Sequence, residues 1–154
     1  MELVKENKEK GRAVYKLADR YRKVWYDIDT KALQEHLKIL DTVMPGWVID
    51  YGFEEDYMWI EYHIVPGIPA NTFEHTPEFV KRIYEFCIDS VKQTRPYVHY
   101  DWVLSNIMID GDNIYLVDWD NVGLYKEKEI MDKMYSDLRS AFGEKFDEML
   151  RTMA

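Results

Sequence analysis

The segment 98–120 places polar residues that suit phosphate or metal chemistry among many apolar ones. They are His99, Asp101, Asn106, Asp118 and Asp120. A strand that only has to fold can avoid carboxylates, because a buried charge is costly unless it is paired. These residues therefore either mark turns or converge on a charged ligand.

A predicted hairpin brings two of these residues together. The runs 106–110 and 113–118 flank a Gly-Asp turn, which indicates two short antiparallel strands. Asn106 at the start of one strand then faces Asp118 at the end of the other, and an amide oxygen beside a carboxylate suits Mg²⁺. Asp101 is close enough in sequence to accept a proton from an attacking hydroxyl at the same place. A metal site beside a proton acceptor is the arrangement that phosphoryl transfer requires.

The spacing His99-x-Asp101-x-x-x-x-Asn106, followed by Asp118-Trp119-Asp120 after a strand, resembles the catalytic and metal-binding loops of the protein-kinase-like superfamily. It is most similar to the aminoglycoside and choline phosphotransferase branch. The resemblance implies that Asp101 is the catalytic base or the acid that orients the substrate, and that His99 braces the loop. It also implies that Asn106 and Asp118 hold Mg²⁺. Asp120 has a weaker parallel, either as a third member of the metal set or only as a support of the loop.

The same resemblance assigns roles along the amino-terminal half. Lys16, in the predicted strand 13–18, would reach the phosphates of ATP, and Glu35 on the following helix would pair with it. An ordinary solvated lysine remains the alternative for Lys16, since this region is rich in lysine. For Glu35, the alternative to an ion pair with Lys16 is an ordinary exposed position on the helix.

Two further segments fit the family pattern. The stretch 59–67, WIEYHIVPG, resembles the strand and hinge of the family, which implies that backbone groups of Glu61, Tyr62 and His63 meet the edge of adenine. The stretch 135–138, YSDL, is similar to a later helix of the family, whose acid, here Asp137, would steady the catalytic loop.

The remaining pattern predicts an α+β chain with two unequal lobes. Strands are expected at 2–6 and 13–18, a helix from Asp29 or Thr30 to Leu40, and a hairpin of 47–51 with 57–65. The segment 20–26 fits a strand or a helix. Thr76-Pro77-Glu78 predicts the start of a helix to about Gln93, and the tail from 127 is helical with a break near Gly143. We expect one kinase-like domain over 1–154, with a small antiparallel-sheet N-lobe at 1–66 and a reduced helical C-lobe at 67–154.

Charge and composition limit the partners. The chain has 154 residues, 20 basic and 29 acidic, for a net charge of −9, which disfavours nucleic acid and anionic membranes. No run approaches the roughly 20 apolar residues of a membrane span, and the charged start does not resemble a signal peptide, so a cytoplasmic protein is expected. The small C-lobe could expose apolar helix faces, which favours a homodimer.

These observations predict a phosphotransferase that uses ATP and Mg²⁺ and moves a phosphoryl group to a hydroxyl of a small molecule, with a protein as the second choice of acceptor. The rival hypothesis is a catalytically weak or inactive kinase-like module that binds nucleotide or a protein partner. The rival rests on the short C-lobe and on the phosphate-binding loop, where Gly11 is the single glycine.

Overall fold

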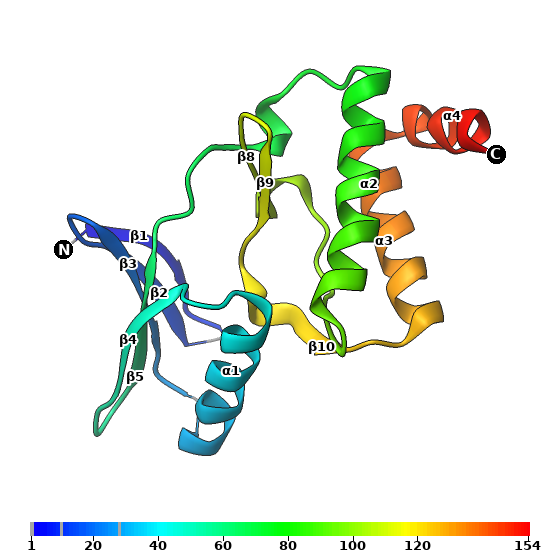
Figure 1. Ribbon diagram of the computed structural model, residues 1–154. Coiled ribbons are helices and arrows are strands. Elements are labelled where there is room, and N and C mark those ends of the chain that lie inside the picture. The colour runs from blue at the N-terminus through cyan, green and yellow to red at the C-terminus, as the bar shows by residue number, and fades with distance from the viewer. Residues whose placement is uncertain (1, 10, 28) are drawn as a thin grey trace. The chain divides into compact units, whose positions relative to one another are not determined.

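The structure is a computed structural model that describes residues 2–9, 11–27 and 29–154. The chain divides into two compact units, Met1–Ile64 and Val65–Ala154, which are called here the amino-terminal and carboxy-terminal units. The division lies two residues before the lobe boundary expected after residue 66. Each unit is described by itself below (Figure 1).

The amino-terminal unit is built on a five-stranded sheet in the order β1-β2-β3-β5-β4, and neighbouring strands pair antiparallel. Its strands are β1 (Glu2–Asn7), β2 (Arg12–Lys16), β3 (Arg20–Trp25), β4 (Val48–Phe53) and β5 (Met58–His63). The expected α+β arrangement with an antiparallel amino-terminal sheet is therefore confirmed. The ambiguous segment 20–26 is the central strand β3, because β2 and β5 pair with it on both sides.

One helix, α1 (Thr30–Val43), accompanies this sheet. Its start is fixed by Asp29, whose carboxylate accepts a hydrogen bond of 2.7 Å from the backbone N–H of Ala32. Leu33 and Leu40 are buried on its apolar stripe, and its contact with β4 covers part of the sheet. The helix thus runs a few residues beyond the expected end at Leu40.

The carboxy-terminal unit contains three helices, α2 (Pro77–Thr94), α3 (Glu127–Phe142) and α4 (Glu144–Met153), which contact one another pairwise (Figure 1). As expected, Thr76 caps α2, and its hydroxyl accepts a 3.1 Å hydrogen bond from the N–H of Phe79. The break between α3 and α4 falls at Gly143, whose φ of 61° suits glycine. Within the described residues, no helix combines the length and the apolar character that crossing a membrane requires.

The carboxy-terminal unit also contains two small antiparallel sheets made of short strands. A three-stranded sheet in the order β6-β8-β9 comprises β6 (Ile68–Pro69), β8 (Ile107–Asp110) and β9 (Asn113–Leu116), while β7 (Tyr97–His99) pairs with β10 (Val122–Leu124). Three 3₁₀ turns, η1 (Ala70–Thr72), η2 (Leu104–Asn106) and η3 (Trp119–Asn121), lie between them. The sequence pattern predicted the β8–β9 hairpin but not β6, β7 or β10, because two or three residues are too few to show an alternating pattern.

A pair of tyrosines ties α2 to α3. The hydroxyls of Tyr84 and Tyr135 lie 2.8 Å apart, and both rings pack edge-on against the buried Phe146 of α4. Burial, reinforced by the hydrogen bond with Tyr135, raises the pKa of Tyr84 to about 12. The folded unit therefore favours the protonated form of this phenol.

We expect this pair to make the chain sensitive to alkali. An unfolded tyrosine has a pKa of about 10, so the stabilisation from neutral Tyr84 is complete below pH ~10 and is lost as the pH rises through about 12. In urea unfolding followed by circular dichroism, the midpoint of the parent should fall more steeply over this range than that of Tyr84→Phe. Tyr51→Phe, at an exposed position on β4, is the control and should behave as the parent. Equal pH dependence of the parent and Tyr84→Phe would contradict this expectation.

Candidate active site

The site begins at His99, the last residue of β7, whose side chain is 1% exposed. Its Nδ1 accepts a 3.0 Å hydrogen bond from the N–H of Asp101, and its Nε2 lies 2.9 Å from the carbonyl oxygen of Val117. A carbonyl only accepts, so Nε2 carries the proton and donates it. The ring thus joins the loop after β7 to the segment after β9, which is the bracing position that the family resemblance implies.

The imidazole is held neutral. Burial lowers the pKa of His99, and the opposing influences include the nearby negative charges of Asp101 and Asp118. Protonation of Nδ1 would place two N–H donors against each other at Asp101 and break the loop contact. His99 is therefore a structural histidine in this site rather than a proton carrier.

The amide of Asn106 closes the loop that starts at Asp101. Its Nδ2 donates to the carbonyl oxygen of Asp101 at 3.3 Å, and its own backbone carbonyl accepts a 2.8 Å bond from the N–H of Val117. This second bond continues the β8–β9 pairing by one residue and places Asn106 opposite Val117, directly before Asp118. The predicted proximity of these segments is present, although β8 begins one residue later and β9 ends two residues earlier than expected.

Asp118 stands on a strained piece of backbone. Its φ of 60° and ψ of 68° lie in the left-handed region, and it is the single non-glycine residue with positive φ in the described chain. The next residue, Trp119, is buried and donates from Nε1 to the carbonyl of Leu116 at 3.0 Å. This anchor turns the chain sharply after β9, a form of strain that often occurs at functional sites. Asp120 follows within η3 and is half-buried.

A helix supports the loop from the other side. The carboxylate of Asp137 on α3 accepts a 2.9 Å hydrogen bond from the N–H of Trp102, whose side chain is fully buried. Lys133, one turn earlier, donates to both carboxylate oxygens of Asp137, at 2.7 and 2.9 Å. The expected contact between Asp137 and the loop is therefore confirmed.

The donor set around this loop is suited to a hard cation. The side chain of Asn106 is mostly buried, and because its amide nitrogen is bound to Asp101, its oxygen lies on the other side of the group. An amide oxygen and the Asp118 carboxylate are both oxygen ligands of the type that Mg²⁺ uses, with water or phosphate completing its shell. No cluster of three or more His, Cys, Asp and Glu side chains suited to a metal occurs in the described residues.

The amino-terminal residues predicted to bind nucleotide make fewer contacts with one another than the residues of the Asp101 loop. Lys16 is the last residue of β2, Glu35 lies on α1, and both side chains are exposed without an ion pair between them. Lys23 on the central strand β3 is a second candidate for a phosphate contact, since it is half-buried and its sheet neighbours are Val14 and the buried Ile60. The sequence did not single out Lys23, because segment 20–26 fits a strand or a helix and its place on a central strand could not be seen.

The structure differs from expectation at Glu61, Tyr62 and His63. All three belong to β5 and have ladder partners on β3, so they do not form a free hinge edge. Trp47 closes the end of the strand: its carbonyl accepts the N–H of His63, and its ring N–H donates to the carbonyl of His63, both at 3.0 Å. Backbone groups engaged in this way are not available to the edge of adenine.

The side chain of Glu61 has a structural role. It is 6% exposed, and its carboxylate binds Arg20 at 3.2 Å and Arg22 at 2.7 Å on the neighbouring strand. A buried carboxylate needs such partners, because leaving it unpaired would cost several kcal/mol. Sequence reasoning missed this cluster, since the alternation of Arg20 and Arg22 is visible only once 20–26 is known to be a strand.

Comparison with solved structures identifies the class of fold. Aminoglycoside phosphotransferase APH(3'')-Id from Streptomyces rimosus aligns with a TM-score of 0.66 and 16% identity over 99% of this chain and 84% of its own. The bifunctional kinase-methyltransferase WbdD aligns with a TM-score of 0.62 and 16% identity over 84% of this chain and 34% of its own. A crystal structure of WbdD at 2.2 Å resolution aligns with a TM-score of 0.61 and 14% identity over 88% of this chain and 36% of its own. The chain therefore has the α+β fold of protein-kinase-like phosphotransferases.

The comparisons also mark the extent of the likeness. This chain spans about a third of the length of the WbdD structures and most of the aminoglycoside phosphotransferase. No protein-family profile matches the sequence, and no curated protein matches it either.

Proposed function

We propose that this chain is a phosphotransferase that moves the γ-phosphoryl group of ATP to a hydroxyl of a small molecule. One observation carries the proposal: His99 and Asn106 bind the backbone on both sides of Asp101 and join this loop to the segment that presents Asp118. A loop held only for folding has no need of a carboxylate, an amide and a second carboxylate at these positions.

The proposed step is an in-line displacement. The acceptor hydroxyl oxygen forms a bond to the γ-phosphorus, the bond from that phosphorus to the bridging oxygen of ADP breaks, and ADP leaves with the electron pair. The proton of the hydroxyl passes to the carboxylate of Asp101. Asn106 and Asp118, assisted by Asp120, would hold Mg²⁺, which when bound neutralises phosphate charge.

Lysine side chains of the amino-terminal unit are the proposed contacts for the phosphates of the nucleotide. Lys16 remains a proposed phosphate contact, with Glu35 as the acid that would pair with it once nucleotide is bound, and Lys23 is added because of its central, half-buried position. Glu61, Tyr62 and His63 are not proposed as adenine contacts, because the sheet uses their backbone.

A specific observation favours the second candidate, a catalytically weak or inactive nucleotide- or partner-binding module. Gly11 has a φ of 62°, and a Cβ at this position would lie 2.7 Å from the carboxylate of Asp27. The positive φ of this turn favours glycine for backbone reasons, and Gly11 is the single glycine where a phosphate-binding loop would lie.

A thermal-shift experiment separates the two candidates. At ATP concentrations ~100 times the dissociation constant, binding adds about 2.7 kcal/mol, which corresponds to a rise in Tm of roughly 5–10 °C for a chain of this size. We expect this rise with ATP and Mg²⁺ together, and a much smaller rise with ATP alone or in Asp118→Asn. Asp112→Asn, in the exposed hairpin turn, is the matched control and should respond as the parent. A shift that does not depend on Mg²⁺ would favour nucleotide binding without transfer, and no shift would favour a partner-binding module.

A further inference from the structure

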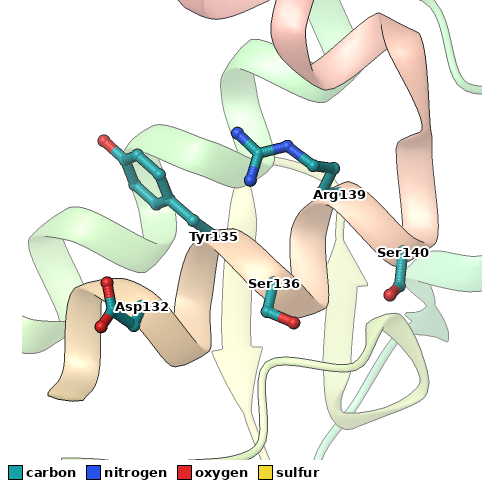
Figure 2. Close-up of a pocket in the computed structure, with 5 residues that line it drawn as sticks. All are labelled: Asp132, Tyr135, Ser136, Arg139 and Ser140. Atoms are coloured by element: carbon teal, nitrogen blue, oxygen red, sulfur yellow. The ribbon is translucent and has the colours of Figure 1, made fainter.

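Helix α3 carries a hollow of about 440 Å³ on its surface, which the proposed transfer reaction does not use (Figure 2). Its lining residues are all capable of hydrogen bonding: Asp132, Tyr135, Ser136, Arg139 and Ser140. They form two rows, Asp132-Ser136-Ser140 and Tyr135-Arg139, each at a spacing of four residues. Such rows are the ridges of a helix surface, and the hollow follows the groove between them.

The Tyr135-Arg139 row is held in place. The hydroxyl of Tyr135 is fixed by Tyr84 at 2.8 Å, and Arg139 donates from Nε to the carboxylate of Asp147 on α4 at 3.0 Å. This ion pair uses one guanidinium nitrogen of Arg139 and leaves its two terminal nitrogens as donors. The row therefore presents a hydroxyl and a cationic fork at little further entropic cost.

The opposite row is open. Thr42 and Thr94, on other helices, turn their hydroxyls back to the carbonyl four residues earlier, both at 3.0 Å. Ser136 and Ser140 form no such bond in the described chain, and they are exposed like Asp132. Figure 2 shows Asp132 toward one end of the hollow, with both serines along the helix on the side away from Arg139.

The charges of the hollow determine its ligand class. Among the lining residues, one carboxylate, Asp132, and one guanidinium, Arg139, stand seven residues apart, about 10 Å along the axis. Asp147 of α4 shares the Arg139 guanidinium through its Nε. The Arg139 side chain leans back toward Tyr135 in Figure 2. Opposite charges at this separation, with hydroxyls between them, match a molecule that carries an ammonium and a carboxylate at its two ends.

We propose that this groove binds small zwitterions of the size of a dipeptide. The ammonium group lies at Asp132, the carboxylate accepts from the terminal nitrogens of Arg139, and the central amide bonds to the hydroxyls of Ser136, Ser140 and Tyr135. An extended dipeptide spans about 7 Å, and a contact of about 3 Å at each end lets it reach across the roughly 10 Å between residues 132 and 139. This site does not depend on phosphoryl transfer.

The test is an NMR titration of the full ¹⁵N-labelled chain with diglycine at low salt and without ATP. We expect the largest amide shifts within residues 132–140 and a dissociation constant on the order of 1–10 mM, because the ionic contacts are exposed. N-acetyl-glycylglycine amide, which has the same backbone without charges, should bind at least about threefold more weakly.

Variants assign the contacts. Asp132→Asn should weaken diglycine binding about three- to fivefold, the range expected for one exposed ion pair. Glu129→Gln, an exposed acid on the same helix outside the hollow, is the matched control and should bind as the parent. Shifts confined to other residues, equal binding of the neutral analogue, or parent-like binding by Asp132→Asn would each overturn the proposal.

Discussion

Asp101→Asn should reduce phosphoryl transfer by about 10²–10⁴-fold, the usual contribution of a positioned general acid or base. The substitution removes the proton acceptor but keeps the shape of the side chain. Both loop bonds of Asp101 use its backbone, with the N–H bound to His99 and the carbonyl bound to Asn106. The loop should therefore persist in the variant, so that lost activity reports lost chemistry.

The measurement is ADP release from ATP and Mg²⁺ with a panel of hydroxyl-bearing small molecules. Asp112→Asn supplies a control with the same chemical change at an exposed turn, and it should retain the parent rate. The Tm of Asp101→Asn should equal that of the parent within about 2 °C, since no bond of the fold is removed. Transfer by Asp101→Asn at the parent rate would refute the assigned role of this carboxylate.

Local sequence chemistry predicted the elements whose signals lie within one segment. Thr76-Pro77-Glu78 specifies the start of α2 because its capping bond and its proline are local features. Gly143 likewise marks the end of α3. The strands β7 and β10 were not predicted, since each has three residues and exists through pairing with a segment more than 20 positions away.

In the amino-terminal unit, strand pairing determines features that the sequence left open or misplaced. The sequence of β3, RYRKVW, is rich in charge, and only pairing with β2 and β5 makes it a strand. Glu61 then becomes the buried partner of Arg20 and Arg22. The bonds from Trp47 extend the sheet as far as His63, and no pattern within 59–67 could show where that pairing ends.

The candidate site was more predictable because its residues are fixed by spacing around one hairpin. Asn106 directly precedes β8, and Asp118 follows β9 by two residues, so both lie at the same end of the hairpin. Formation of the hairpin therefore brings their segments together. The left-handed backbone of Asp118 was not predictable, since aspartate seldom adopts it and the anchor is the burial of Trp119.

His99 should be the most sensitive residue of this site for stability. Its ring is almost fully buried, packs against Trp102 and Trp119 with centroids 6.0 and 4.9 Å away, and satisfies two backbone groups. His99→Ala removes the packing and leaves the N–H of Asp101 and the carbonyl of Val117 without these partners. We expect a loss of about 3 kcal/mol or more in the free energy of unfolding.

A graded series distinguishes the two causes of that loss. His99→Gln can replace one of the two hydrogen bonds, so it should recover about 1 kcal/mol relative to His99→Ala. His63→Ala, at an exposed position, is the matched control and should lie within about 0.5 kcal/mol of the parent. Urea unfolding gives these free energies, and hydrogen exchange of the Asp101 amide reports the loop contact itself, which should be protected in the parent and exposed in His99→Ala. In the parent, the Asp101 N–H donates to Nδ1 of His99. If this amide were protected equally in His99→Ala, the imidazole would not be what holds the loop.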